Sequence, residues 1–157
     1  MRFPVLLVSV LILAACATQP TPQQLAGSTT TVTMLGLAPR VTAADRAKFD
    51  AALAVCEQRT SKLPEMPAEQ GVEIALGCLL GQGIAMRSGA SKTVDVVGMK
   101  KFSVTNPGIA QAAWVRDQAI CTNAVLDTVS PGSLQAALLM LGCMIGLSER
   151  EYELDQQ

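Results

Sequence analysis

The sequence contains no histidine, which removes the commonest general base and the commonest metal ligand of proteins. No Ser–His or Cys–His pair can form, and no P-loop or dinucleotide-binding glycine pattern opens a helix after a strand. Carboxylates such as Asp45, Glu57, Glu73 and Asp117 are scattered at spacings typical of a solvated surface. The sequence therefore predicts that the protein is not an enzyme and holds neither a metal nor another cofactor.

Aromatic residues and charged runs are also scarce. Phe, Trp and Tyr make up 3% of the 157 residues, whereas half of the residues are hydrophobic, so a core must be built from Ala, Val, Leu, Ile and Met. Small side chains of this kind favour closely packed helices over a thick sandwich. The formal charge is -1 without a long run of either sign, whereas nucleic-acid binding requires a basic face. We expect one domain that does not bind nucleic acid.

The first 16 residues have the order of a bacterial export signal. Arg2 gives a short positive start, residues 5–13 form an apolar run too short to span a bilayer, and Leu13-Ala14-Ala15-Cys16 follows. This segment resembles the lipobox of bacterial lipoproteins. The resemblance implies removal of residues 1–15 and acylation of Cys16 on its thiol and its new amine, with several acyl chains giving stable anchoring. The alternative is an ordinary signal peptide cut after Ala15.

The segment that follows Cys16 is expected to be a lipidated N-terminus and flexible tether over residues 16–40. Residues 18–24 are polar and Pro-rich, so they cannot bury enough surface to fold. Residues 29–37 are rich in Thr and Val and are expected to lie extended against the body. Position 17 is Ala rather than Asp, which by the enterobacterial sorting pattern indicates the outer membrane. The predicted location is therefore the outer membrane, with the protein lipid-anchored and facing the periplasm.

The rest of the chain repeats itself after 65 residues. One motif occurs twice, as Leu76-Gly77-Cys78-Leu79-Leu80-Gly81 and as Leu141-Gly142-Cys143-Met144-Ile145-Gly146. At the same offset Cys56 falls on Cys121 and Gln70 on Gln135. Apolar residues recur at helical spacing in both copies. We expect a mainly α fold over residues 41–152, made of two tandem helical hairpins (about 42–88 and 106–152) that form a four-helix domain about a pseudo-two-fold axis.

Capping and proline signals predict where the four helices begin, namely near Thr42, Ala68, Asn106 and Ser130. The second is expected to run to Arg87, where Gly89 ends it, and the last to continue through residues 149–152. Between the repeats, residues 93–97 and 102–105 are rich in Val and Thr and flank a glycine-containing turn. This arrangement is consistent with a small β-hairpin that rests on the helices.

Four cysteines remain once Cys16 is acylated: Cys56, Cys78, Cys121 and Cys143. An even number of cysteines in an exported chain favours disulfides. A zinc site is the rival, but zinc usually requires closely spaced cysteine pairs, and four buried thiols are the other alternative. Of the three connectivities we favour Cys56–Cys78 and Cys121–Cys143, each within one hairpin. Helix geometry leaves a mismatch of about one turn between the paired positions, so the other connectivities stay open.

Glycines lie in pairs on two of the expected helices. Gly77 and Gly81 share one helix face, and Gly142 and Gly146 do the same. Glycine inside a helix costs about 1 kcal/mol relative to alanine, so the repeated spacing indicates a packing role. One interpretation packs the two helices against each other within the monomer. The other places the glycines in a homo-oligomer seam or in a membrane, although both apolar segments are short for a span.

These features predict a lipid-anchored, periplasm-facing binding or adapter lipoprotein of the bacterial envelope, without catalysis and with an envelope protein as partner. The alternative is a membrane-active or self-assembling lipoprotein that uses its glycine-spaced apolar helices. A soluble form starting at Ala17 separates the two hypotheses. It should be monomeric and leave liposomes intact under the first, whereas oligomers or dye leakage would favour the second.

Overall fold

The computed structural model describes residues 28–104, 106, 108–147 and 154–156. The lipidation site Cys16 and the signal segment before it therefore lie outside the described residues. The helices are α2 (Arg46–Thr60), α3 (Ala68–Gly81), α4 (Gln111–Leu126) and α5 (Leu134–Leu147). The strands are β1 (Thr29–Pro39), β2 (Met86–Val97), β3 (Phe102–Val104) and β4 (Leu154–Gln156). The four expected helices are present, but the fold is mixed α/β and not mainly α.

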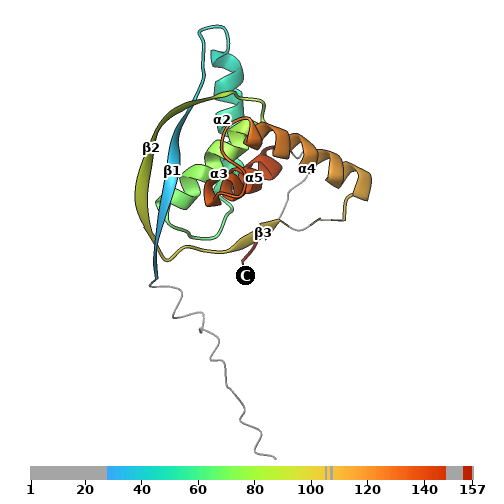
Figure 1. Ribbon diagram of the computed structural model, residues 1–157. Coiled ribbons are helices and arrows are strands. Elements are labelled where there is room, and N and C mark those ends of the chain that lie inside the picture. The colour runs from blue at the N-terminus through green and yellow to red at the C-terminus, as the bar shows by residue number, and fades with distance from the viewer. Residues whose placement is uncertain (1–27, 105, 107, 148–153, 157) are drawn as a thin grey trace, which may run out of the picture.

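The duplication extends beyond the helices to the strands. Each half of the chain has the order β-α-α-β, and Gln111 starts α4 65 residues after Arg46 starts α2. The two strands of each half pair with each other in antiparallel fashion, β1 with β2 and β3 with β4. Each repeat is therefore a helical hairpin whose two ends are joined by a two-stranded ribbon. The β1–β2 ribbon arches along one side of the helices (Figure 1).

The expected β-hairpin between the repeats does not form. Residues 93–97 belong to β2 and pair with β1, whereas Phe102–Val104 pairs with Leu154–Gln156. A hairpin across residues 98–101 would give β2 a partner only three residues long, whereas β1 offers eleven. The longer partner satisfies more backbone hydrogen-bonding groups, so the long-range pairing replaces the local one. The extended segment expected at residues 29–37 is thus a strand of the folded body.

Helix α3 ends at Gly81 and not, as expected, at Arg87. Gly83 has a φ of 72°, a left-handed conformation that favours glycine. Its N–H donates to the Leu80 carbonyl at 2.9 Å, and the N–H of Ile84 donates to the Leu79 carbonyl at 2.9 Å. These two bonds form a Schellman motif, which closes the helix and turns the chain into β2. Gly83 is therefore the stop signal, and Gly89 lies within a strand.

The other helices begin a few residues after the expected caps, at Arg46, Gln111 and Leu134. Thr42 and Asn106 order the preceding turns instead. Thr42 Oγ1 accepts the N–H of Asp45 at 3.3 Å, and Asn106 Oδ1 accepts the N–H groups of residues 108 and 109. Helix α5 ends at Leu147, and its expected continuation through residues 149–152 lies outside the described residues.

Helices α3 and α5 form the centre of the molecule. Nine residues of α5 and seven of α3 are buried. One buried cluster joins these helices to the ribbon through Met34, Ile74, Val96, Leu138 and Ile145. In contrast, α2 buries only Ala52 and Cys56, and α4 buries only Cys121 and Val125. The outer helices therefore contribute little apolar burial of their own.

Candidate functional site at the centre of the repeats

Helices α3 and α5 meet backbone to backbone at the four glycines. A Cβ atom on Gly77 would collide with the Leu139 carbonyl and lie 2.9 Å from the Leu139 Cα. A Cβ on Gly142 would likewise collide with the Ile74 carbonyl and lie 2.8 Å from the Cys78 nitrogen. Real Cβ atoms do not approach backbone atoms so closely. These glycine faces are therefore occupied within the monomer.

The contacts across this interface come in symmetric pairs. Gly77 faces Leu139, and Gly142 faces Ile74, each residue lying 65 positions from its counterpart. Gly81 faces Cys143, and Gly146 faces Cys78, in the same relation. A pseudo-two-fold axis therefore passes between α3 and α5.

Two disulfides join the outer helices to this central pair. Cys56 is bonded to Cys78 with a Cα–Cα distance of 5.8 Å, and Cys121 to Cys143 with 5.6 Å. Both distances are in the usual range for disulfides. The structure thus confirms the pairing within each repeat and removes the zinc and free-thiol alternatives.

Two buried glutamines tie each repeat to the other. Gln135 accepts the N–H of Leu35 at 2.8 Å and donates to its carbonyl at 2.7 Å. Gln70 accepts the N–H of Lys100 at 3.1 Å and donates to its carbonyl at 2.6 Å. Leu35 and Lys100 are themselves 65 residues apart. Each side-chain amide therefore pairs with backbone as a neighbouring strand would, across the boundary between repeats.

The symmetry is broken at Glu73, whose counterpart in the second repeat is Leu138. Glu73 is only 5% exposed, so its interpretation as a surface carboxylate is wrong. Its Oε2 accepts a hydrogen bond from Gln135 Nε2 at 3.0 Å. Burial raises the pKa of Glu73, while the Gln135 hydrogen bond and the charge of Lys92 act in the opposite direction. The mismatch with Leu138 is the sequence signal that could have identified this residue as unusual.

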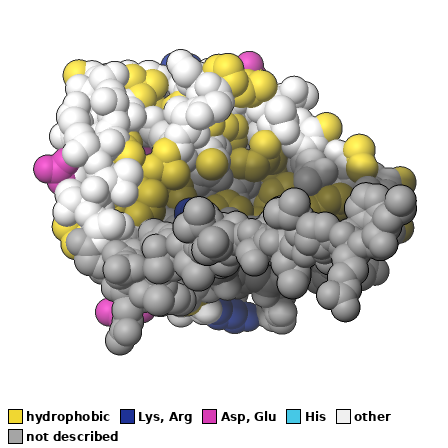
Figure 2. Space-filling view, turned by 60° about the horizontal axis from the view of Figure 1, so that its bottom comes forward, with side chains coloured by type: hydrophobic (Ala, Val, Ile, Leu, Met, Phe, Trp, Pro, Cys, Tyr) yellow, Lys and Arg dark blue, Asp and Glu magenta, His cyan; other side chains and the backbone are white. Residues whose placement is uncertain are grey.

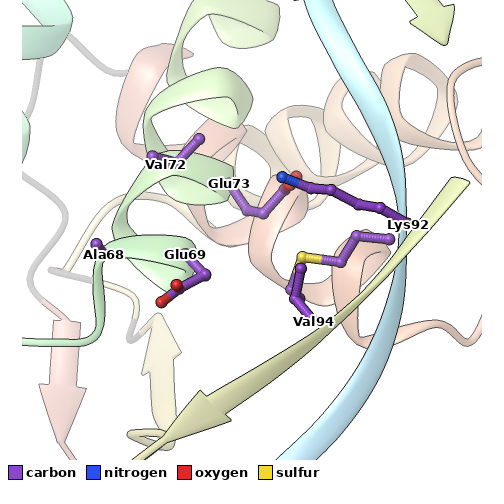
Figure 3. Close-up of a pocket in the computed structure, with 7 residues that line it drawn as sticks. Ala68, Glu69, Val72, Glu73, Lys92 and Val94 are labelled. Atoms are coloured by element: carbon purple, nitrogen blue, oxygen red, sulfur yellow. The ribbon is translucent and has the colours of Figure 1, made fainter. Parts of the chain in front are cut away.

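Glu73 lies in a cavity of about 190 Å³ between the start of α3 and the β1–β2 ribbon. The other residues that line it are Met34, Ala68, Glu69, Val72, Lys92 and Val94. Lys92 reaches from the ribbon with its ammonium pointing toward Glu73 (Figure 3). The cavity therefore combines apolar walls with one buried carboxylate and one amine.

A second cavity, of about 230 Å³, lies between α4 and α5. Its lining is mainly apolar and includes Val104, Trp114, Met140 and Met144. In the part of the chain that the structure describes, no three His, Cys, Asp or Glu side chains gather as metal ligands would. Of these two cavities, only the Glu73 cavity has charged side chains in its lining.

Replacing Glu73 by glutamine is expected to stabilise the protein at neutral pH. Because the native pKa is raised above 4.5, the folded state binds the proton more tightly than the unfolded state. Wild-type stability should therefore fall as the pH rises from below 4.5 through the native pKa, and the penalty is complete above it. Glu73→Gln keeps the hydrogen bond with Gln135 and removes the charge, so it should be more stable than the wild type at about pH 7, and this advantage should vanish at about pH 4.

Denaturant unfolding at the two pH values measures this difference. Glu57→Gln is the matched control, because Glu57 is exposed on α2 and its substitution should change stability at neither pH. An equal gain for Glu73→Gln at both pH values would contradict the titration of Glu73, and a loss at neutral pH would show that its charge is stabilising.

No protein-family model matches this chain, and neither a curated protein nor a solved structure is detectably similar to it. The disulfides, the cavity and the exposed surface therefore carry the functional argument by themselves.

Proposed function

We propose that this protein is a lipid-anchored binding or adapter lipoprotein of the bacterial outer membrane, facing the periplasm and without a catalytic role. The observation that carries the proposal is the pair of disulfides, Cys56–Cys78 and Cys121–Cys143. Disulfides of this kind form and persist in oxidising compartments such as the periplasm. An export signal over residues 1–15 would deliver the chain there, and the segment from the lipidated Cys16 to residue 28 would tether the body that begins with β1.

The outer face of α4 supports a protein partner. Val115 and Leu126 lie on one face of the helix and are 51% and 47% exposed, and Ile120 on another side of α4 is 45% exposed. The positions equivalent to Val115 and Leu126 in the first repeat are Asp50 in α2 and Ser61 directly after it, so the fold itself does not require apolar residues there. Exposed apolar side chains gathered on one element are typical of protein–protein contact surfaces. We assign the partner-binding role to this face of α4.

Hydrophobic side chains are also exposed in a hollow on the side of the molecule that lies at the bottom of Figure 1 and is turned forward in Figure 2. Apolar surface of this kind is consistent with a binding role. The alternative, a membrane-active or self-assembling lipoprotein, depended on glycine faces that α3 and α5 present to each other. Of the helices in the described ranges, none combines the length and apolar character needed to cross a bilayer. These observations favour the adapter over the alternative.

Cross-linking in intact cells followed by membrane fractionation tests the proposal. Wild-type protein should appear processed in the outer membrane and cross-linked to one specific envelope protein. Cys16→Ser should abolish acylation and maturation, because the thiol that receives the lipid is missing. Val115→Asp combined with Leu126→Ser, which introduces the residue types found at the equivalent positions of the first repeat, should leave anchoring intact and remove most of the cross-linked product.

Thr18→Ala in the tether is the control and should behave as the wild type does. If the Cys16→Ser protein is still processed and still fractionates with the detergent phase as a membrane protein, the proposed lipid anchor at Cys16 is wrong. An undiminished cross-linked product in the α4 variant would show that the partner binds elsewhere.

A further inference from the structure

We propose that the cavity at Glu73 binds a small zwitterion, an α-amino acid with an aliphatic side chain, through its ammonium group on Glu73 and its carboxylate on Lys92. The inference rests on the proposed binding role and adds a small ligand to it. Three features of the cavity carry it: a carboxylate that the fold does not require, a matching size, and charges of opposite sign on facing walls.

The fold does not require a carboxylate at position 73. In the second repeat the equivalent residue is Leu138, which is 3% exposed and packs in the same buried cluster as Ile74. Both helices present this position toward the core, and an aliphatic side chain fills it in one of them. A buried carboxylate is costly to desolvate, so its presence in only one repeat indicates a role other than packing.

The size and walls of the cavity select a small aliphatic group. A cavity of about 150 Å³ holds a benzene-sized molecule, and this one measures about 190 Å³. Met34 from β1 and Val94 from β2 line the cavity from the ribbon. Val72 from α3 lies at the rim and is 56% exposed. An amino acid with a branched side chain of four carbon atoms would fit this space and cover Val72.

The polar groups provide one partner for each end of a zwitterion. Gln135 occupies Oε2 of Glu73, and the carboxylate can accept further hydrogen bonds through Oε1. Lys92 points its ammonium into the cavity and acts on Glu73 through its charge (Figure 3). A zwitterion placed between them would replace this attraction by two charge-assisted hydrogen bonds. Glu69 at the rim adds negative charge, which disfavours ligands that carry only an acid.

Methyl NMR of the full chain, purified in detergent with ¹³C-methyl methionine, tests the proposal. Met34 lines the Glu73 cavity, whereas Met140 and Met144 line the cavity between α4 and α5 and serve as internal controls. The probes are leucine, 3-methylbutylamine and 4-methylpentanoate, which share the same branched hydrocarbon chain and differ in their charged groups. Leucine should shift the Met34 signal with saturation and leave the two control signals unchanged. The amine and the acid should each bind at least about tenfold more weakly, because each lacks one charged hydrogen bond.

Two substitutions test which side chain binds each charged group of the ligand. Lys92→Met should reduce the affinity for leucine to that for the amine, and Glu73→Gln should reduce it to that for the acid. Lys101→Met, at an exposed residue outside the cavity, is the control and should have no effect. A Met34 signal that does not move, an amine that binds as tightly as leucine, or equal shifts at Met140 would overturn the proposal. Such a result would not contradict the proposed lipid anchor or the proposed partner-binding surface on α4, because cross-linking and fractionation test those two proposals separately.

Discussion

Replacing Gly142 by alanine is expected to destabilise the protein by about 3 kcal/mol or more, at the upper end of the range for overpacking a core. The added Cβ would lie 2.8 Å from the Ile74 carbonyl carbon and from the Cys78 nitrogen. Both atoms belong to the backbone of α3, so no side-chain rotation can relieve the clash. The helices would have to separate, which would weaken packing along the whole α3–α5 interface.

Gly71→Ala is the matched control, because Gly71 lies in α3 but outside the interface. A Cβ there would meet only side-chain atoms of Met66, at 3.9 and 4.0 Å. Alanine already occupies the equivalent position in α5, at Ala136. Since alanine is the better helix former by about 1 kcal/mol, Gly71→Ala should stabilise the protein.

Thermal and denaturant unfolding of the two variants compare one substitution in two environments. Opposite signs are expected, a loss for Gly142→Ala and a gain for Gly71→Ala. A Gly142→Ala variant as stable as the wild type would contradict the close approach of α3 and α5. A loss of the same size for both variants would indicate a general effect of substituting glycine in this domain.

The sequence predicted the helices, the duplication and the disulfide pairing because their signals are local or repeated. Periodic apolar residues mark each helix, and the 65-residue offset aligns Cys56 with Cys121 and Cys78 with Cys143. The glycine pairs restricted the packing to two interpretations. Choosing between them required knowing that α3 and α5 face each other across the pseudo-two-fold axis.

The sequence could not predict the strand pairing or the cavity, because both depend on contacts between distant segments. Local turn signals favoured a hairpin across residues 98–101, whereas the partner of β2 begins at Thr29. Two glycines, Gly83 and Gly89, could have ended α3, and only the left-handed conformation of Gly83 distinguishes them. Glu73 is buried because the β1–β2 ribbon covers the start of α3, so an error in the strands also misplaced this carboxylate.

The alignment of Gln70 with Gln135 was visible in the sequence, but its meaning was not. Each amide binds both backbone groups of one residue in the other repeat, Lys100 or Leu35. Nothing in the sequence near either glutamine identifies that partner. The structure shows that the two repeats are interlocked by these bonds as well as packed together.

Removing both disulfides is expected to destabilise the protein by about 6 kcal/mol, because each bond closes a loop worth roughly 3 kcal/mol of chain entropy. That loss is comparable to the whole stability of many small domains. The way the outer helices are packed makes these two disulfides especially important. Helix α2 buries only Ala52 and Cys56, and α4 buries only Cys121 and Val125, so each outer helix depends on its cysteine for a large part of its attachment.

The two repeats allow equivalent pairs of substitutions, and each pair is the control for the other. Cys56→Ala with Cys78→Ala should lower the melting temperature by about 10 °C or more. Amide hydrogen exchange should rise chiefly in α2, while α4 stays protected. Cys121→Ala with Cys143→Ala should lower the melting temperature similarly and expose α4 instead.

Hydrogen exchange distinguishes this local attachment from a general effect on the unfolded chain. If the disulfides acted only on the unfolded state, either pair of substitutions would raise exchange in both outer helices to the same extent. Faster exchange confined to the helix whose cysteine was replaced would instead show that each bond holds its own helix on the α3–α5 pair. An unchanged melting temperature in both variants would contradict any stabilising role. We expect the confined pattern, because α2 and α4 are attached through separate buried clusters, one around Cys56 and one around Cys121.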